Sequence, residues 1–125
     1  MTLSILLAIV LGFFSMVQTP ASTPQEPSVP KQYFIAIFSR GSAWEDAKPA
    51  NEQVGFKEHS ENLRRLRTEK KIPIGGRYGE KGMVIVEAKN EEEARSLFAS
   101  DMMVQKKTFA LELHQFRPFY KGTIE

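Results

Sequence analysis

The chain contains no cysteine among its 125 residues, which excludes disulfide bonds, thiol nucleophiles and a lipid-modified cysteine anchor. The domain must therefore be stabilised by its core and by any assembly that it makes. An excess of charge of one sign is also missing. All 17 Lys and Arg side chains lie from Lys31 onward with 14 of the 15 acidic ones, which leaves a net charge of +3 there. That balance is too mild for binding dominated by phosphate contacts, so we expect no nucleic-acid partner.

The first thirty residues have no Lys or Arg and contain an uncharged run of thirteen residues, "ILLAIVLGFFSMV", from Ile5 to Val17. The run is shorter than the roughly 20 residues that span a bilayer and has the length of a secretory h-region. Residues 1–21 are therefore predicted to be a signal peptide, and the protein to be periplasmic or secreted. Because the basic n-region is missing, an uncleaved anchor stays open, and only then would a membrane be a partner. Residues 22–30, rich in Pro, Ser and Thr, are predicted to be a disordered tether.

Apolar patterns, turn residues and capping residues predict six regular elements in one domain, which covers residues 31–121. The predicted strands are 31–38, 72–78, 83–88 and 108–116. One helix is predicted over residues 55–71, and a second begins after Asn90, which forms a capping-box pattern with Glu93. A long loop around Trp44 joins the first strand to the first helix.

The predicted order of strand, helix, strand, strand, helix, strand indicates an α+β fold of the ferredoxin-like βαββαβ type. In that plan four strands form an antiparallel sheet with both helices on one face, and the first and third strands lie in the middle. Segments 31–38 and 83–88 are apolar on both of their sides, as central strands should be. The helices explain one apolar face of the sheet. We expect a second copy of the chain to cover the other face, giving a homodimer.

A histidine interrupts the apolar stripe of the first predicted helix. At 100° per residue, Phe56, His59, Leu63 and Leu66 share one face, so His59 should point inward. An inward histidine is more often a core residue with satisfied hydrogen bonds than a catalytic one. A buried imidazole must find hydrogen-bond partners.

Three stretches together resemble the YCII-related (YciI-like) domain over nearly all of residues 31–121. They are "YFIAIFSRG", "KEHSENLRRLRTEKKIPIGGRYGEKGMVIVEAKNEEEARSLFASD" and "FRPF". The family is similar to muconolactone isomerase, so the resemblance implies a dimeric α+β barrel. It also implies a His and Asp active-site pair at His59 and Asp101, in which Asp101 would fix the tautomer of the ring and leave its other nitrogen free as a base. Asp101 has an alternative role as the cap of a following helical turn. One degradative member removes chloride from a hydroxylated aromatic ring.

The chain departs from that family pattern at three points. It has Asp101-Met102 where members commonly have Asp-Pro, and Gly76-Arg77-Tyr78 where they commonly have Gly-Pro-Phe. The third departure is the predicted export signal, since such domains are usually cytosolic. These departures bear on the physiological substrate.

Other residues are weaker candidates for a ligand site. Arg40 and Arg77 could clamp a carboxylate or phenolate, and Trp44 or Tyr78 could wall an aromatic ligand, although each is more often a surface or loop residue. Gly76, with the glycine before it, indicates a strand bulge or a close backbone approach, of which the bulge is the commoner meaning.

Neither a metal nor a cofactor site is expected from the sequence. The second histidine, His114, is predicted on the exposed side of an edge strand, without a carboxylate or second histidine at ligand spacing. The stretch "GGRYGEKG" lacks the Lys-Ser or Lys-Thr pair of a phosphate loop.

Three functions remain open from the sequence. The first is a cofactor-free isomerase, lyase or dehalogenase-type enzyme, in which His59 and Asp101 move a proton on a small aromatic or carboxylated compound. The second is a non-catalytic module that binds a small ligand in the same pocket. The third is a structural dimer.

Overall fold

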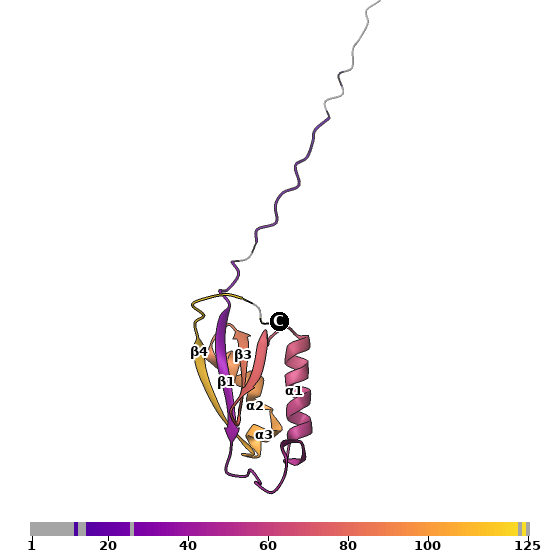
Figure 1. The fold of residues 1–125 in the computed structure, drawn as a ribbon. Helices are drawn as coiled ribbons and strands as arrows, with labels where there is room; N and C mark the ends of the chain where they lie inside the picture. Colours follow the sequence, from indigo (N-terminus) through magenta and orange to yellow (C-terminus); the bar gives the residue numbers. More distant parts are fainter. Residues whose placement is uncertain (1–11, 13–14, 26, 123, 125) are drawn as a thin grey trace, which may run out of the picture.

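The computed structural model describes residues 12, 15–25, 27–122 and 124. Residues 1–11 and 13–14, which make up most of the predicted signal peptide, lie outside the described residues. The described segments 15–25 and 27–30 form no helix or strand and are exposed. Figure 1 shows this part of the chain running away from the folded domain. No helix in the described part of the chain has the length and apolar character needed to cross a bilayer.

The described residues form four strands, three α-helices and one turn of 3-10 helix. In chain order they are β1 (Gln32–Arg40), η1 (Ala50–Glu52), α1 (Phe56–Thr68), β2 (Ile74–Tyr78), β3 (Lys81–Ala88), α2 (Glu91–Ala99), α3 (Met102–Gln105) and β4 (Phe109–Phe116). η1 is a single turn of 3-10 helix. The fold is α+β, as predicted.

The four strands form one antiparallel sheet in the order β2-β3-β1-β4 (Figure 1). β1 and β3 therefore occupy the middle, where their two-sided apolar pattern placed them. On β1, Ala36 lies opposite Val84 of β3 and Leu113 of β4, and all three are buried. The arrangement is compatible with a ferredoxin-like fold.

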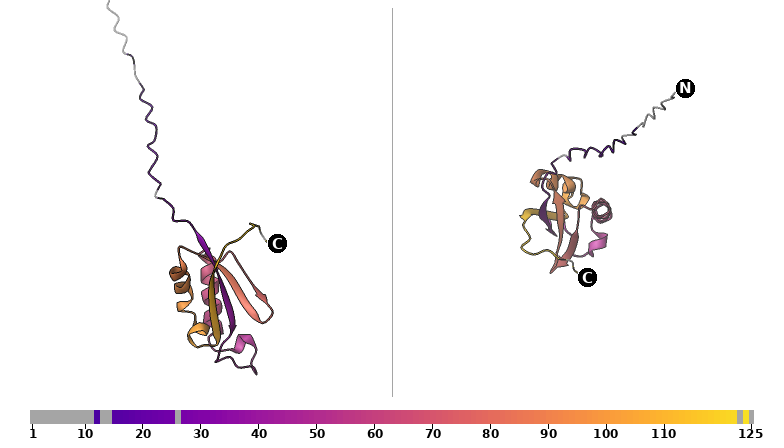
Figure 2. Two further views of the ribbon diagram at one scale, coloured as in Figure 1. Left: turned by 90° about the vertical axis from the view of Figure 1, so that its left-hand side faces the viewer. Right: turned by 90° about the horizontal axis from the view of Figure 1, so that it is seen from above.

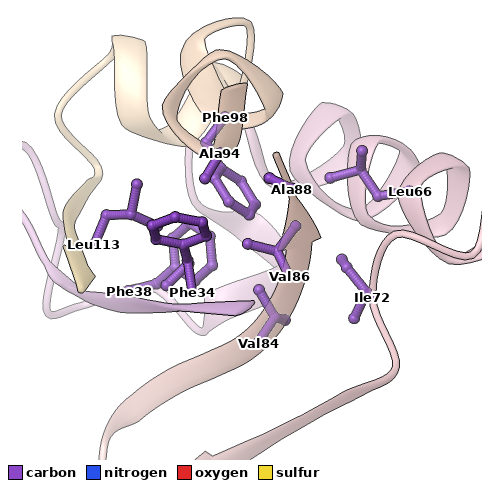
Figure 3. Close-up of a cluster of buried hydrophobic side chains, with 11 residues drawn as sticks. Phe34, Phe38, Leu66, Ile72, Val84, Val86, Ala88, Ala94, Phe98 and Leu113 are labelled. Carbon is purple, nitrogen blue, oxygen red and sulfur yellow. The ribbon is translucent and has the colours of Figure 1, made fainter. Parts of the chain in front are cut away.

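The core lies between this sheet and the helices (Figure 3). Side chains alternate along a strand, so every second residue of β1 and β3 points to the helices. From the helices, Leu66 of α1 and both Ala94 and Phe98 of α2 meet them with no exposed surface. Fully burying a phenylalanine such as Phe98 stabilises the fold by about 1.5–3 kcal/mol. The buried side chains from the sheet are Phe34, Ala36, Phe38, Val84, Val86, Ala88 and Leu113.

Among the described residues, no helix packs on the other side of the sheet, which carries the alternate, apolar residues of β1. Figure 2 shows the ribbon from two further sides. Tyr33, Ile35 and Ile37 of β1 are partly buried there by their neighbours in the sheet. Nearer the edges, Ile74 is 40% exposed and Phe116 is 37% exposed. We call this side the open face.

α1 ends three residues earlier than predicted. Lys70 has a left-handed backbone with φ of 58°, and its N–H donates to the carbonyl of Arg67 at 2.9 Å. The N–H of Lys71 donates to the carbonyl of Leu66 at 2.8 Å. These two bonds form a Schellman cap, which satisfies the last carbonyls of the helix. The prediction that Lys70 and Lys71 belong to the last turn is wrong, because the cap here is built without glycine.

β2 contains no bulge, so that expectation is also wrong. Its residues pair with β3 in continuous register, with Gly75 opposite Val84 and Gly76 opposite Met83. The other expectation, a close approach of a neighbouring group to the backbone, fits Gly75. A Cβ added there would lie 2.9 Å from a methyl carbon of Val84. Nothing lies within 4 Å of a Cβ added at Gly76.

The predicted cap of α2 is confirmed. The side chain of Asn90 accepts a hydrogen bond from the N–H of Glu93 at 2.8 Å. In return, the Glu93 carboxylate accepts from the N–H of Lys89 at 2.6 Å. That backbone hydrogen bond, with a smaller contribution from the positive charge of Lys71, lowers the pKa of Glu93 below its ordinary value of 4.5.

Candidate functional site

His59 and Asp101 lie in contact, although 42 positions separate them in the sequence. His59 Nδ1 is 2.6 Å from Asp101 Oδ2. His59 lies in the first turns of α1, and Asp101 is the N-cap residue of α3. The carboxylate is fully buried and the histidine is 7% exposed. Because a carboxylate accepts hydrogen bonds, we assign the ring proton to Nδ1, and Nε2 then carries the lone pair.

Asp101 holds two further groups. Its Oδ1 accepts from the N–H of Met103 at 3.1 Å, which caps α3. Its Oδ2 also accepts a long hydrogen bond of 3.4 Å from the amide of Asn62. Asn62 is held in turn by a bond of 2.8 Å from Arg65 to its side-chain oxygen. The carboxylate therefore both orients His59 and caps a helix, so the two roles considered from the sequence coexist.

The ring of His59 lies between two aromatic side chains. It meets Phe38 edge to face at 5.0 Å between ring centres, and Phe109 at 5.2 Å in the same manner. Among the described residues, Nε2 makes no hydrogen bond, and no buried side-chain nitrogen or oxygen is left without a partner. Nε2 is therefore accessible rather than sealed, and His59 is one of the residues that line a cavity.

The cavity lies between α1 and the β2–β3 edge of the sheet and has a volume of about 400 Å³. Its aromatic walls come from four different parts of the chain, namely Phe38, Trp44, Phe56 and Phe109. Its polar and charged residues are His59, Ser60, Arg67, Arg77 and Glu80. An apolar cavity of this size with a few polar groups is typical of a site for a small molecule.

Of the other predicted ligand residues, Trp44 lines the cavity, and Arg40 contacts two residues that line it, Trp44 and Glu80. Trp44 stacks on Phe109 at 5.7 Å with 16° between the rings. The Arg40 guanidinium lies over Trp44 at 5.2 Å and forms ion pairs with Asp46 at 3.4 Å and Glu80 at 3.2 Å. Arg40 therefore ties the loop after β1 to the turn between β2 and β3.

The predicted group Gly76, Arg77 and Tyr78 is divided between the two faces of the sheet. Arg77 pairs with Gly82, two positions from the Gly75–Val84 pair, and so lies on the helix side, where it lines the cavity. Gly76 also borders the cavity. Tyr78 alternates with Arg77 and lies on the open face, 45% exposed and outside the cavity.

Three polar or charged lining residues were missed by the sequence reasoning, namely Ser60, Arg67 and Glu80. Arg67 had a readable signal, because it follows His59 and Leu63 at intervals of four on the same helix face. Glu80 had none, since it belongs to a turn whose direction only the folded hairpin defines.

His114 lies on the open face at the outer edge of the sheet. Its Nε2 is 3.4 Å from the carboxylate of Glu112, a neighbour on the same strand face that the sequence reasoning overlooked. Within the described residues, no group of three or more His, Cys, Asp or Glu side chains is placed to hold a metal ion.

Comparison with known proteins adds no assignment. No family model matches the chain, and neither a curated protein nor a solved structure matches it. The chemistry of this site must therefore be argued from its own geometry.

Proposed function

We propose that this chain is a YCII-related protein that uses His59 to move a proton on a small ring-bearing or carboxylated molecule without a cofactor. One observation carries the proposal. One nitrogen of His59 is fixed on a buried carboxylate, the other makes no hydrogen bond among the described residues, and the histidine lines a cavity with aromatic walls. A base held in one tautomer beside a ligand-sized space is the arrangement that general acid-base catalysis requires.

The proposed reaction begins when Nε2 of His59 removes a proton from a carbon or hydroxyl of the bound molecule. The imidazolium that forms is stabilised by the negative charge of Asp101, whose carboxylate contacts Nδ1 at 2.6 Å. In an isomerisation, Nε2 returns the proton to a different atom of the same molecule. In an elimination, the electron pair from the broken bond expels a leaving group such as halide, and the proton later passes to solvent.

We propose that the domain has the ferredoxin-like βαββαβ fold and that two copies of the chain form a dimeric α+β barrel. The open face supports this assembly, because its central side chains Tyr33, Ile35 and Ile37 are apolar and no element of the described chain covers them. Stable interfaces bury about 800 Å² on each partner, which a four-stranded sheet face can supply. A second copy is self-complementary to this face through a two-fold axis.

We further propose that the protein is exported. The uncharged run from Ile5 to Val17 supports this, as does the exposed segment 15–25 and 27–30 that precedes β1.

A second candidate is a domain that binds a small ligand, or is purely structural, without catalysis. The observation that favours it is the cap of α3, where Asp101 accepts from the N–H of Met103 at 3.1 Å. That bond gives the buried carboxylate a structural reason to be present. The histidine would then complete the hydrogen bonds of Asp101 and have no role in chemistry.

The first experiment is a thermal-shift screen of the protein with small aromatic acids, lactones and phenols, followed by turnover assays on each compound that raises Tm. Under the proposed function, His59→Gln keeps the ligand-induced shift but slows turnover by about 10²–10⁴-fold, the usual contribution of an acid-base group. His114→Gln is the matched control and leaves both unchanged.

The alternatives give different results in the same experiment. Binding without turnover in both forms identifies a non-catalytic module. If His59→Gln turns over substrate at the rate of the unchanged protein, the assignment of His59 as the base is wrong. If no compound shifts the Tm of either form, only the structural reading remains.

A further inference from the structure

Two arginines line the cavity without a charged partner. Arg67 belongs to α1 and Arg77 to β2, so they approach the cavity from the helix and from the sheet. Within the described part of the chain, neither guanidinium forms a salt bridge or a side-chain hydrogen bond. Arg65 and Arg95 behave differently, since each pairs with a glutamate four residues away on its own helix.

The cavity's own acid does not neutralise these two cations. Among the described residues that line the cavity, Glu80 is the only carboxylate, and its charge is engaged by Arg40 at 3.2 Å. The lining is therefore left with an excess of positive charge, carried by two exposed guanidinium groups. Paired guanidinium groups bind carboxylates well, because their planar donors match the two oxygens.

The helix sets the distance between this charge and the proposed base. His59, Leu63 and Arg67 succeed one another at intervals of four along one face of α1. At about 1.5 Å per residue, the backbones of His59 and Arg67 lie roughly 12 Å apart along the axis. Helical side chains lean toward the N-terminus, so the guanidinium of Arg67 leans toward His59. The space between them is suited to a single ring that carries a carboxylate.

The walls beside this space are aromatic. Phe38 and Phe109 flank His59, and Trp44 stacks on Phe109. An inorganic anion or a short aliphatic acid would leave these faces uncovered, whereas an aromatic ring would stack on them. The volume of about 400 Å³ lies at the small end of the range for ligand sites, which admits one ring rather than several.

We infer that the ligand of this cavity is a small aryl carboxylate, with its carboxylate held by Arg67 and Arg77 and its ring against the aromatic walls beside His59. This inference deepens the proposed function and rests on it only for the chemistry at His59. The binding itself depends on the two arginines and the aromatic walls. The two arginines are specificity-determining residues, because they select for the charge of the ligand.

Binding can be measured directly, because Trp44 is the only tryptophan of the chain and lines the cavity. We suggest titrating the full chain at pH 7.5 with benzoate, with benzamide as its neutral counterpart and with acetate as the charge without the ring. Quenching of Trp44 fluorescence reports binding. Benzoate is expected to bind at least about ten-fold more tightly than either of the other two, since each lacks half of the recognised features.

Variants test whether benzoate binding depends on Arg67 and Arg77 themselves or only on the overall positive charge of the helix. Arg67→Gln and Arg77→Gln should each weaken benzoate binding by about ten-fold and leave benzamide binding unchanged. Both positions are exposed, so the fold should survive. Arg64→Gln is the matched control, because it removes the same charge from the solvent side of α1, and it should bind benzoate as the unchanged protein does.

The inference is overturned by no binding of benzoate, by equal binding of benzamide, or by equal loss of affinity in Arg64→Gln. Equal binding of acetate would show that the ring is not recognised and would also overturn it. The proposed function fails separately. If benzoate binding depends on the arginines but no aryl carboxylate is turned over in a His59-dependent way, the site binds without catalysis. If a neutral lactone is turned over by His59 while benzoate does not bind, the catalytic proposal stands and the anion inference falls.

Discussion

The two sides of the sheet each carry a histidine beside a carboxylate, and the two pairs differ in almost every physical respect. On the helix side, His59 and Asp101 are 2.6 Å apart and buried. On the open face, His114 and Glu112 are 3.4 Å apart, and more than half of each side chain is exposed. The buried pair joins two elements far apart in sequence. The exposed pair joins neighbours on one strand.

The difference shows that the energy of a histidine–carboxylate contact depends on how far the pair is buried. Water screens the exposed pair, so its attraction is weak and each side chain is free to leave the other. The buried pair cannot exchange its contact for hydrogen bonds to water. Loss of one member leaves the other without a partner in a low-dielectric interior, which is costly.

The largest expected effect comes from removing the carboxylate on each side in turn. Asp101→Ala should lower the free energy of unfolding by about 3–5 kcal/mol, because it strands His59 Nδ1 and removes the cap of α3. Glu112→Ala should change it by less than about 0.5 kcal/mol. Urea unfolding followed by circular dichroism measures both. Equal values for the two variants would show that the burial difference has no energetic weight.

Asp101→Asn keeps an acceptor for the Met103 N–H. Its loss in free energy of unfolding should therefore lie between the losses in Asp101→Ala and Glu112→Ala.

A smaller effect is expected on assembly through the open face. Ile35→Glu should weaken the proposed dimer roughly one hundred-fold, because it buries an unpaired charge at the centre of the interface. The variant should remain folded, since Ile35 points away from the helices. Ser42→Glu, at an exposed loop position, is the control and should leave the dimer intact. Sedimentation velocity over a range of concentrations measures the association. A dimer that survives Ile35→Glu would place the interface elsewhere.

The smallest effect concerns a carboxylate of intermediate exposure, Glu93. Its pKa is lowered in the folded protein, so its ionised form stabilises the fold above the ordinary value of 4.5. That stabilisation is lost as the pH falls through the lower, folded pKa. Glu93→Gln should therefore be less stable than the unchanged protein at pH 7, by at most about 1 kcal/mol, and the gap in Tm should narrow as the pH falls below 4.5. A gap that stays constant from pH 7 to pH 3 would show that the charge plays no part.

The fold was largely readable from sequence because its signals are local. The apolar pattern of β1 and β3 predicted that both strands lie in the middle of the sheet, and Asn90 with Glu93 predicted the start of α2. The end of α1 was missed because Lys70, and not glycine, takes up the left-handed cap. A lysine in that conformation has no distinguishing pattern in the sequence.

The candidate site was readable only in part because its contacts are long-range. Helical periodicity showed that His59 points inward, but only a family resemblance suggested Asp101 as its partner. Strand alternation would have separated Arg77 from Tyr78, since neighbours in a strand face opposite sides. Helical spacing would likewise have added Arg67. The pair of Arg40 and Glu80 depends on how a loop meets a turn, which no local pattern specifies.

The position of β1 has a mechanical consequence. The segment before Lys31 continues directly into this strand, which lies between β3 and β4 and is antiparallel to both. Ladder hydrogen bonds run perpendicular to the strands, so tension applied through that segment acts on two ladders in shear. An edge strand would have one ladder to resist that tension. The segment before Lys31 is thus joined to the sheet at a strand that two ladders hold.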